Sequence, residues 1–147
     1  MSHSYSQNHI HLVFSTKDRQ RLITKARQKK LWAYIAGICK SYDILPFTIG
    51  GMEDHVHLLF RLPPVITLAH AISVVKANSS RWMREHGTAF AWQKGYGAFS
   101  VSSSHIHTVI RYIDTQEAHH HKRTFEQEYL ALLEKHGVRY DPDSVFA

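Results

Sequence analysis

The chain has 147 residues, 44% of them apolar, which fits one domain with a hydrophobic core. Lysine and arginine number 18 against 12 aspartates and glutamates, and the net charge of +6 favours a polyanionic partner such as nucleic acid. No apolar run approaches the roughly 20 residues of a membrane span, and the N-terminus lacks the basic-then-apolar layout of a signal peptide. Because Cys39 is the one cysteine, an internal disulfide is excluded, and we expect a cytoplasmic protein.

Hydrophobic periodicity predicts six elements in the order β-α-β-β-α-β, followed by two helices. The expected strands are 9–15, 45–50, 55–62 and 95–102. The expected helices are 24–42, 67–86, 105–120 and 124–137, with Thr24, Thr67, Ser104 and Thr124 as N-caps. The glycine pair at 50–51 is expected to form a turn.

The first six of these elements match the ferredoxin-like split βαβ arrangement. The predicted fold class is therefore α+β, with a four-stranded antiparallel sheet and two additional C-terminal helices. No linker or repeat interrupts the pattern, so we assign residues 1–147 to one domain. This fold hosts many functions, and the function has to be argued from particular residues.

Three His-x-His triplets, at 9–11, 55–57 and 105–107, are the first chemical signal. Residues i and i+2 of a strand project from one face, so His55 and His57 form a two-nitrogen platform for a divalent metal. In the first turn of a helix the same spacing is about 200° around the axis, so the rings of triplet 105–107 diverge. Triplet 9–11 lies on the strand expected beside 55–62 and competes by geometry alone. A strand His-x-His is also often two half-buried or solvated histidines, so spacing alone does not establish a metal site.

The segment "VIRYIDTQ" offers a nucleophile and a further ligand. Tyr112 and Gln116 are four residues apart on an expected helix and therefore share a face. A tyrosine oxygen can attack phosphorus and form a covalent phosphotyrosine, and a glutamine carbonyl oxygen can ligate a hard divalent cation. The helix is apolar, and Tyr112 packed at its edge is the alternative. The sequence indicates no general base beside Tyr112.

Taken together, these residues resemble the single-tyrosine transposases of the simplest bacterial insertion sequences, members of the His-hydrophobic-His (HUH) nuclease group. The resemblance runs in order through "HIHLVFSTKDRQRLI", "GGMEDHVHLLF", "SVVKANSSRWM", "WQKGYGAFSVS" and "RYIDTQEAHH", and thus covers most of the chain. The pairing of "DHVHLLF" with a downstream "YIDTQ" is fairly specific. The C-terminal "TFEQEYLALLEKHGVRYD" also resembles one branch of the family.

The resemblance implies that His55, His57 and Gln116 bind Mg²⁺ or Mn²⁺ and that Tyr112 is the catalytic nucleophile. It further implies cleavage of single-stranded DNA at the ends of an insertion sequence, with a 5′-phosphotyrosine intermediate and a free 3′-OH. Implied partners are DNA hairpins near the element ends and a second copy of the chain, with active sites completed in trans. The implied location is the bacterial cytoplasm, at the nucleoid when the enzyme is active.

Clustered cations are expected to neutralise DNA phosphates. The predicted DNA-binding residues are Lys17, Arg19 and Arg21 after the first strand, Lys76, Arg81 and Arg84 on the second helix, and Arg111 beside Tyr112. Each of them taken singly could equally be a solvated surface charge.

Two hypotheses from different classes remain. The first is a metal-dependent transposase that acts through Tyr112. The second is a non-catalytic, ferredoxin-like nucleic-acid-binding protein whose histidines are structural. The combination of His55 and His57 with Tyr112 and Gln116 favours the first.

Overall fold

The computed structural model describes residues 4–147, so positions 1–3 of the predicted domain lie outside the described residues. Four strands form one antiparallel sheet in the order β2-β3-β1-β4. The strands are β1 (Asn8–Ser15), β2 (Leu45–Met52), β3 (His55–Leu62) and β4 (Gly97–Val101). The first and third strands are neighbours, as the split βαβ arrangement requires, and the predicted α+β class is confirmed.

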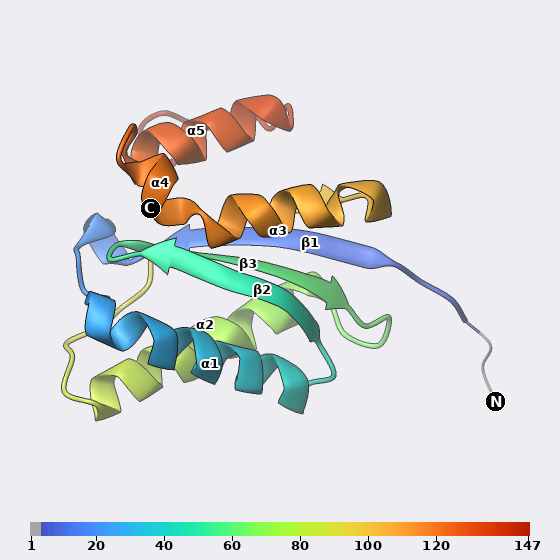
Figure 1. Cartoon of the computed structure of the whole chain (residues 1–147), viewed down its shortest axis with the longest axis horizontal. Helices are drawn as coiled ribbons and strands as arrows, with labels where there is room; N and C mark the ends of the chain where they lie inside the picture. Colours follow the sequence, from blue (N-terminus) through green and yellow to red (C-terminus); the bar gives the residue numbers. More distant parts are fainter. Residues whose placement is uncertain (1–3) are drawn as a thin grey trace.

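Helices cover both faces of this sheet (Figure 1). One face carries α1 (Lys25–Ser41) and α2 (Leu68–Glu85). The other carries α3 (Ile106–Asp114), α4 (Gln116–His120) and α5 (Phe125–Lys135). Two short 3-10 turns, Lys17–Arg19 and Ser103–His105, follow β1 and β4.

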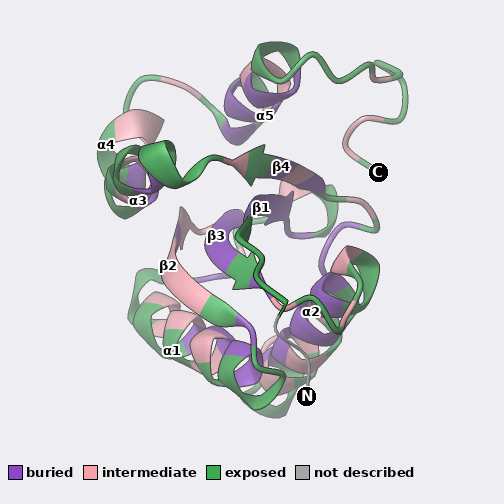
Figure 2. Ribbon diagram, turned by 90° about the vertical axis from the view of Figure 1, so that its right-hand side faces the viewer, coloured by how far each residue is buried: buried purple, intermediate pink, exposed green. Residues whose placement is uncertain are grey.

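Strand alternation decides which side chains meet each helical layer. Ile10, Leu12 and Phe14 of β1 belong to the larger core, together with Leu31 and Ile35 of α1. Val13 points the other way, into a smaller core with α5. Figure 2 shows the buried residues concentrated on β1, β3 and the inward helix faces. The strand predicted over 9–15 is therefore confirmed, and its alternation places the histidines of β1 and β3 under α3–α5.

The helix predicted over 105–120 is interrupted, which corrects the expectation of two C-terminal helices to three. Thr115 has φ −110° and ψ 28°, and its hydroxyl donates to the Arg111 carbonyl at 2.8 Å. A threonine hydroxyl that bonds to the preceding turn often bends a helix. The predicted Ser104 cap is also wrong, because His105 occupies the N-cap position of α3 without a side-chain cap. Tyr112 and Gln116 consequently lie on two different helices.

Of the other predicted caps, Thr24 occupies the N-cap position of α1 but makes no side-chain cap hydrogen bond, whereas Thr67 and Thr124 do cap their helices. Thr67 accepts from the His70 amide, and Thr124 forms a full capping box with Gln127. Gly137 has φ +65° just after α5, the left-handed conformation that glycine adopts at low cost. The C-terminal tail docks on α5, since Phe146 and Val145 pack against the smaller core.

The glycine pair does not form the turn itself: β2 continues through it to Met52, and the turn follows at 53–54. Its role is close packing, because a Cβ on Gly50 would lie 2.6 Å from the carbonyl oxygen of Ile113 on α3. Gly50 thus lets the helix that carries the predicted nucleophile approach the edge of the sheet.

We expect Gly50→Ala to lower the free energy of unfolding by about 1–3 kcal/mol, the usual cost of forcing a methyl group into a packed region. Gly37→Ala is the matched control, because a Cβ added at Gly37, in the middle of α1, would have no neighbouring atom within 4 Å. There alanine should be neutral or stabilise by up to about 1 kcal/mol. Urea unfolding of the two variants checks this, and equal stability would contradict the packing role of Gly50.

Candidate active site

Two histidines of β3 project from one face of the sheet under α4 and α5. His55 and His57 are both completely buried. His55 Nε2 lies 2.9 Å from Gln116 Oε1, and His57 Nε2 lies 3.0 Å from a carboxylate oxygen of Glu128. The structure therefore brings the predicted residues His55, His57 and Gln116 to one centre.

Glu128 on α5 stands in the middle of this centre and was not among the predicted residues. It is fully buried, and its Oε1 lies 3.0 Å from His57 Nε2, 3.1 Å from His120 Nε2 and 3.5 Å from His55 Nε2. Burial would raise the pKa of Glu128, but His57 and the hydrogen bonds from His120 and His57 bring that pKa far below its ordinary value. The carboxylate is thus held ionised among imidazoles.

A sequence signal for Glu128 did exist. It lies three residues after Phe125 and four before Leu132, so it occupies the apolar stripe of α5. A carboxylate on the buried face of a helix needs a partner. His120, at the end of α4, had no comparable signal, because it stands in a run of three histidines.

Tyr112 on α3 adjoins the same centre. Its hydroxyl donates to the second oxygen of Glu128 and accepts from Arg123 Nη2 at 3.3 Å. Its ring centroid is 5.7 Å from that of His57 in the same chain. Burial and the neighbouring Glu128 raise the pKa of Tyr112 above its usual value, so the hydroxyl is protonated in this arrangement. The sequence left its activation open, and the structure supplies a carboxylate as its hydrogen-bond acceptor.

The outer nitrogen of each β3 histidine is held by a further side chain. His55 Nδ1 donates to Asp54 at 2.7 Å, and His57 Nδ1 is 2.8 Å from His11 Nε2. Such outer partners fix the tautomer and aim the inner nitrogen at a metal. The second triplet therefore enters the site through His11, as a neighbour of His57. His9 lies on the same strand face but packs against Phe47.

The residues at this centre fit a divalent metal ion. Ligand atoms of His55, His57 and Glu128 all lie within 4.8 Å of one another. With its proton on Nδ1, His55 would turn the lone pair of Nε2 toward the Gln116 oxygen at 2.9 Å, and a cation bound between these two atoms would satisfy both. Imidazole nitrogens with carboxylate and amide oxygens form a donor set that suits Mn²⁺, and the oxygens also suit Mg²⁺.

The predicted DNA-binding cations do not gather into one patch. Lys17, Arg19 and Arg21 follow β1, at the sheet end where Ser15 pairs with His55. Arg19 lies 3.7 Å from Glu126 and over the Phe146 ring, and Arg21 lies 3.6 Å from Glu53. Arg111 is exposed beside Tyr112. Lys17, Arg19 and Arg21 therefore lie at the end of the sheet near the histidine centre, and Arg111 lies on the face of the sheet that holds it.

The three cations of α2 lie on the opposite face of the sheet. Lys76 donates to the carbonyls of residues 93, 94 and 95 at 2.6, 3.1 and 3.0 Å. Arg84 reaches the Phe90 carbonyl at 3.4 Å, and Arg81 donates to Asn78 at 2.7 Å. The ammonium of Lys76 is therefore engaged within the fold. DNA contact by all seven cations stays a prediction.

Acid should destabilise the metal-free protein through His11. Burial and the adjacent His57 lower the pKa of His11 to about 3, against 6.5 for a free side chain. Between these values the unfolded chain binds a proton that the folded chain does not, so stability falls as pH drops below about 6.5. We expect a loss of roughly 1.5 kcal/mol from this residue between pH 6.5 and 5. Urea unfolding in EDTA checks it: His11→Gln should flatten this slope, and an unchanged slope would contradict the assignment.

The geometry defines a candidate phosphoryl-transfer centre, in which a tyrosine adjoins a set of metal-ligating groups. The family model described as "Transposase IS200 like" matches residues 4–116. The chain therefore belongs to the IS200-like transposase family. The match includes His55, His57, Tyr112 and Gln116 and ends before α5, so Glu128 lies outside it.

Two solved structures share the fold. A candidate transposase from Deinococcus radiodurans R1 aligns with a TM-score of 0.62 and 22% identity, over 79% of this chain and 96% of that one. A REP-associated tyrosine transposase bound to a REP hairpin also aligns with a TM-score of 0.62, at 12% identity over 82% and 73% of the two chains. No curated protein matches the chain significantly. Within residues 4–147, no helix combines the length and apolar character of a membrane span.

Proposed function

We propose that this transposase cuts and rejoins single-stranded DNA at insertion-sequence ends, using Mg²⁺ or Mn²⁺ and a 5′-phosphotyrosine at Tyr112. One observation carries the proposal. A single carboxylate, Glu128, contacts the Tyr112 hydroxyl with one oxygen and both β3 histidines with the other. The nucleophile and the metal-ligating histidines thus contact the same side chain, and a metal-assisted attack on a phosphate requires such proximity.

The residues divide the chemistry between them. His55, His57, Glu128 and Gln116 would hold the metal, which supplies polarisation of the phosphate and offsets its developing charge. Tyr112 forms the new bond to phosphorus as the bond from phosphorus to the 3′ oxygen breaks, and the departing 3′ oxygen ends with the proton. Arg123, which donates to the Tyr112 oxygen, is placed to pair with the phosphate. A second 3′-OH reverses the step, so no nucleotide triphosphate is needed for joining.

The α5 helix covers this centre, since His55, His57 and Glu128 are completely buried. Because Tyr112 adjoins His57 of its own chain, each subunit holds a complete set of the proposed residues. Homodimerisation with sites completed in trans stays a prediction. The REP hairpin on the structural neighbour supports a DNA hairpin as partner, and a DNA substrate would place the reaction at the nucleoid in the cytoplasm.

The test is a covalent-adduct assay on single-stranded DNA taken from the flanks of the gene, in Mn²⁺ and in Mg²⁺. We expect a protein–DNA adduct that survives denaturation, with a free 3′-OH on the released fragment. Tyr112→Phe should give none, whereas Tyr140→Phe, on the C-terminal tail, should match the wild type. If Tyr112→Phe formed as much adduct as the wild type, or the wild type formed none with a cognate end, the non-catalytic alternative would be favoured.

A further inference from the structure

A cavity of about 640 Å³ opens beside Tyr112, and the proposed chemistry does not use it. Its walls come from α3 and α5, which lie on the same face of the sheet, and residues 100–102 at the end of β4 also line it. This volume falls within the range of sites that hold small molecules, about 300–1,000 Å³. Because α5 lies beyond the family match, one wall of this cavity comes from outside the matched residues.

The lining combines positive charge with apolar walls. Arg123 and Lys135 carry the charge, and none of the described lining residues is an aspartate or glutamate. Val109 and Leu132 provide apolar surface on the two helices, and His136 adds an imidazole stacked on Phe99 at 4.5 Å. A purely apolar ligand would leave both cations without a counter-charge, whereas a nucleotide offers a flat base for the walls and a phosphate for the cations.

Arg123 connects the cavity to the reacting atom. It lines the cavity, and its guanidinium donates to the Tyr112 hydroxyl at 3.3 Å. Tyr112 itself is also part of the wall. A phosphate attacked by Tyr112 would therefore lie at the mouth of the cavity, with Arg123 beside it.

We propose that this cavity binds the deoxynucleotide on the 3′ side of the cut, which stays joined to Tyr112 through its 5′ phosphate. This rests on the proposed function. The attacking and leaving oxygens are roughly in line across phosphorus, so the 3′ oxygen departs on the side away from Tyr112. The nucleotide that remains attached lies next to the tyrosine, where the cavity begins. Its base packs between α3 and α5, and Lys135 pairs with the phosphate that follows.

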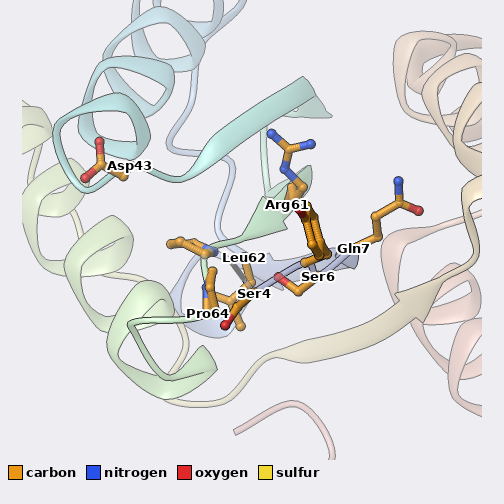
Figure 3. A pocket seen from close by; sticks show the side chains of 9 residues that line it. Ser4, Ser6, Gln7, Asp43, Arg61, Leu62 and Pro64 are labelled. Atoms are coloured by element: carbon orange, nitrogen blue, oxygen red, sulfur yellow. The ribbon is translucent and has the colours of Figure 1, made fainter. Parts of the chain in front are cut away.

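A second cavity in the molecule is less suited to this nucleotide. Figure 3 shows another cavity, of about 580 Å³, lined by residues 4–7, Asp43 and Arg61. It lies where Asn8 pairs with Leu62, at the opposite end of β1 from Ser15 and His55. Neither Tyr112 nor Arg123 is among the described residues that line it, so it does not adjoin the nucleophile. It also contains a carboxylate, which the cavity beside Tyr112 lacks.

The test titrates metal-free, isotope-labelled full-length protein with thymidine 5′-monophosphate and follows histidine side chains by NMR. Signals of His105 and His136, which line the cavity, should shift and saturate in the millimolar range. His70 and His86 of the α2 side are internal controls and should not shift. Thymidine and inorganic phosphate are tested separately. Each should bind about tenfold more weakly, because each makes only part of the contacts.

Ala131→Trp, which fills the cavity from α5, should weaken nucleotide binding about tenfold, the scale of one lost base-stacking contact. Lys40→Ala, on the exposed side of α1, should bind as the wild type does. Unchanged binding by Ala131→Trp, equal shifts at His70 and His86, or no saturable shift at all would overturn the inference. Nucleotide binding without a DNA adduct would overturn the proposed function alone. An adduct without nucleotide binding would overturn only this subsite.

Discussion

His57→Ala is expected to abolish divalent-metal binding and, with it, covalent attachment of DNA. His57 contributes one of the two β3 imidazoles and lies 3.0 Å from the shared carboxylate. Replacing outer partners of metal ligands already costs about 10–100-fold in affinity or activity, and loss of a direct ligand should exceed that. Calorimetric titration with Mn²⁺ and the adduct assay, both on protein shown to be folded by circular dichroism, measure the two effects.

His107→Ala is the matched control for this substitution. It also belongs to a His-x-His triplet, but the triplet lies at the start of a helix and His107 is exposed. Metal affinity and adduct yield should equal those of the wild type. If the two variants bound Mn²⁺ alike, the β3 histidines would be structural.

Glu128→Gln is expected to cost about 3 kcal/mol of stability in metal-free protein, because it leaves buried donors without the carboxylate oxygen that accepts from them. The substitution keeps the shape of the side chain, so packing is little changed. The carboxylate accepts from Tyr112 and Gln116 and adjoins three histidine nitrogens, and an amide can satisfy only part of this set. The stabilisation of the wild type by Mn²⁺ should also shrink strongly in the variant.

Glu126→Gln serves as the control on the same helix. Glu126 is half-exposed and makes one 3.7 Å ion pair with Arg19, so its loss should change stability by no more than about 0.5 kcal/mol. Urea unfolding in EDTA, repeated with Mn²⁺, compares the two variants. Equal stability of both in EDTA would show that Glu128 does not hold the centre together.

Much of the molecule could be predicted from the sequence, because strand and helix periodicities are properties of neighbouring residues. The alternation in 55–62 placed His55 and His57 on one face, and the split βαβ order placed 9–15 beside them. The contact of His11 with His57 follows from these two features. The N-cap at Thr124 was likewise predicted from the sequence, because a cap depends on residues only three apart.

Other features depend on contacts that these local patterns do not contain. The break at Thr115 depends on a side-chain bond that competes with the helix, and the use of Gly50 depends on how closely α3 approaches β2. Periodicity identified the buried face of α5 but not the surface that it covers. That surface is set by packing of Phe125, Tyr129 and Leu132 against Val13 and Phe99, residues distant in sequence.

That packing inserts Glu128 between the histidines and Tyr112 and completes the centre. The fold class and the pairing of the β3 histidines are thus readable from the chain alone, since both follow from short-range patterns. Which carboxylate the histidines meet, and which cavity opens beside the nucleophile, is set only in the folded molecule, because both depend on long-range contacts between a helix and a sheet.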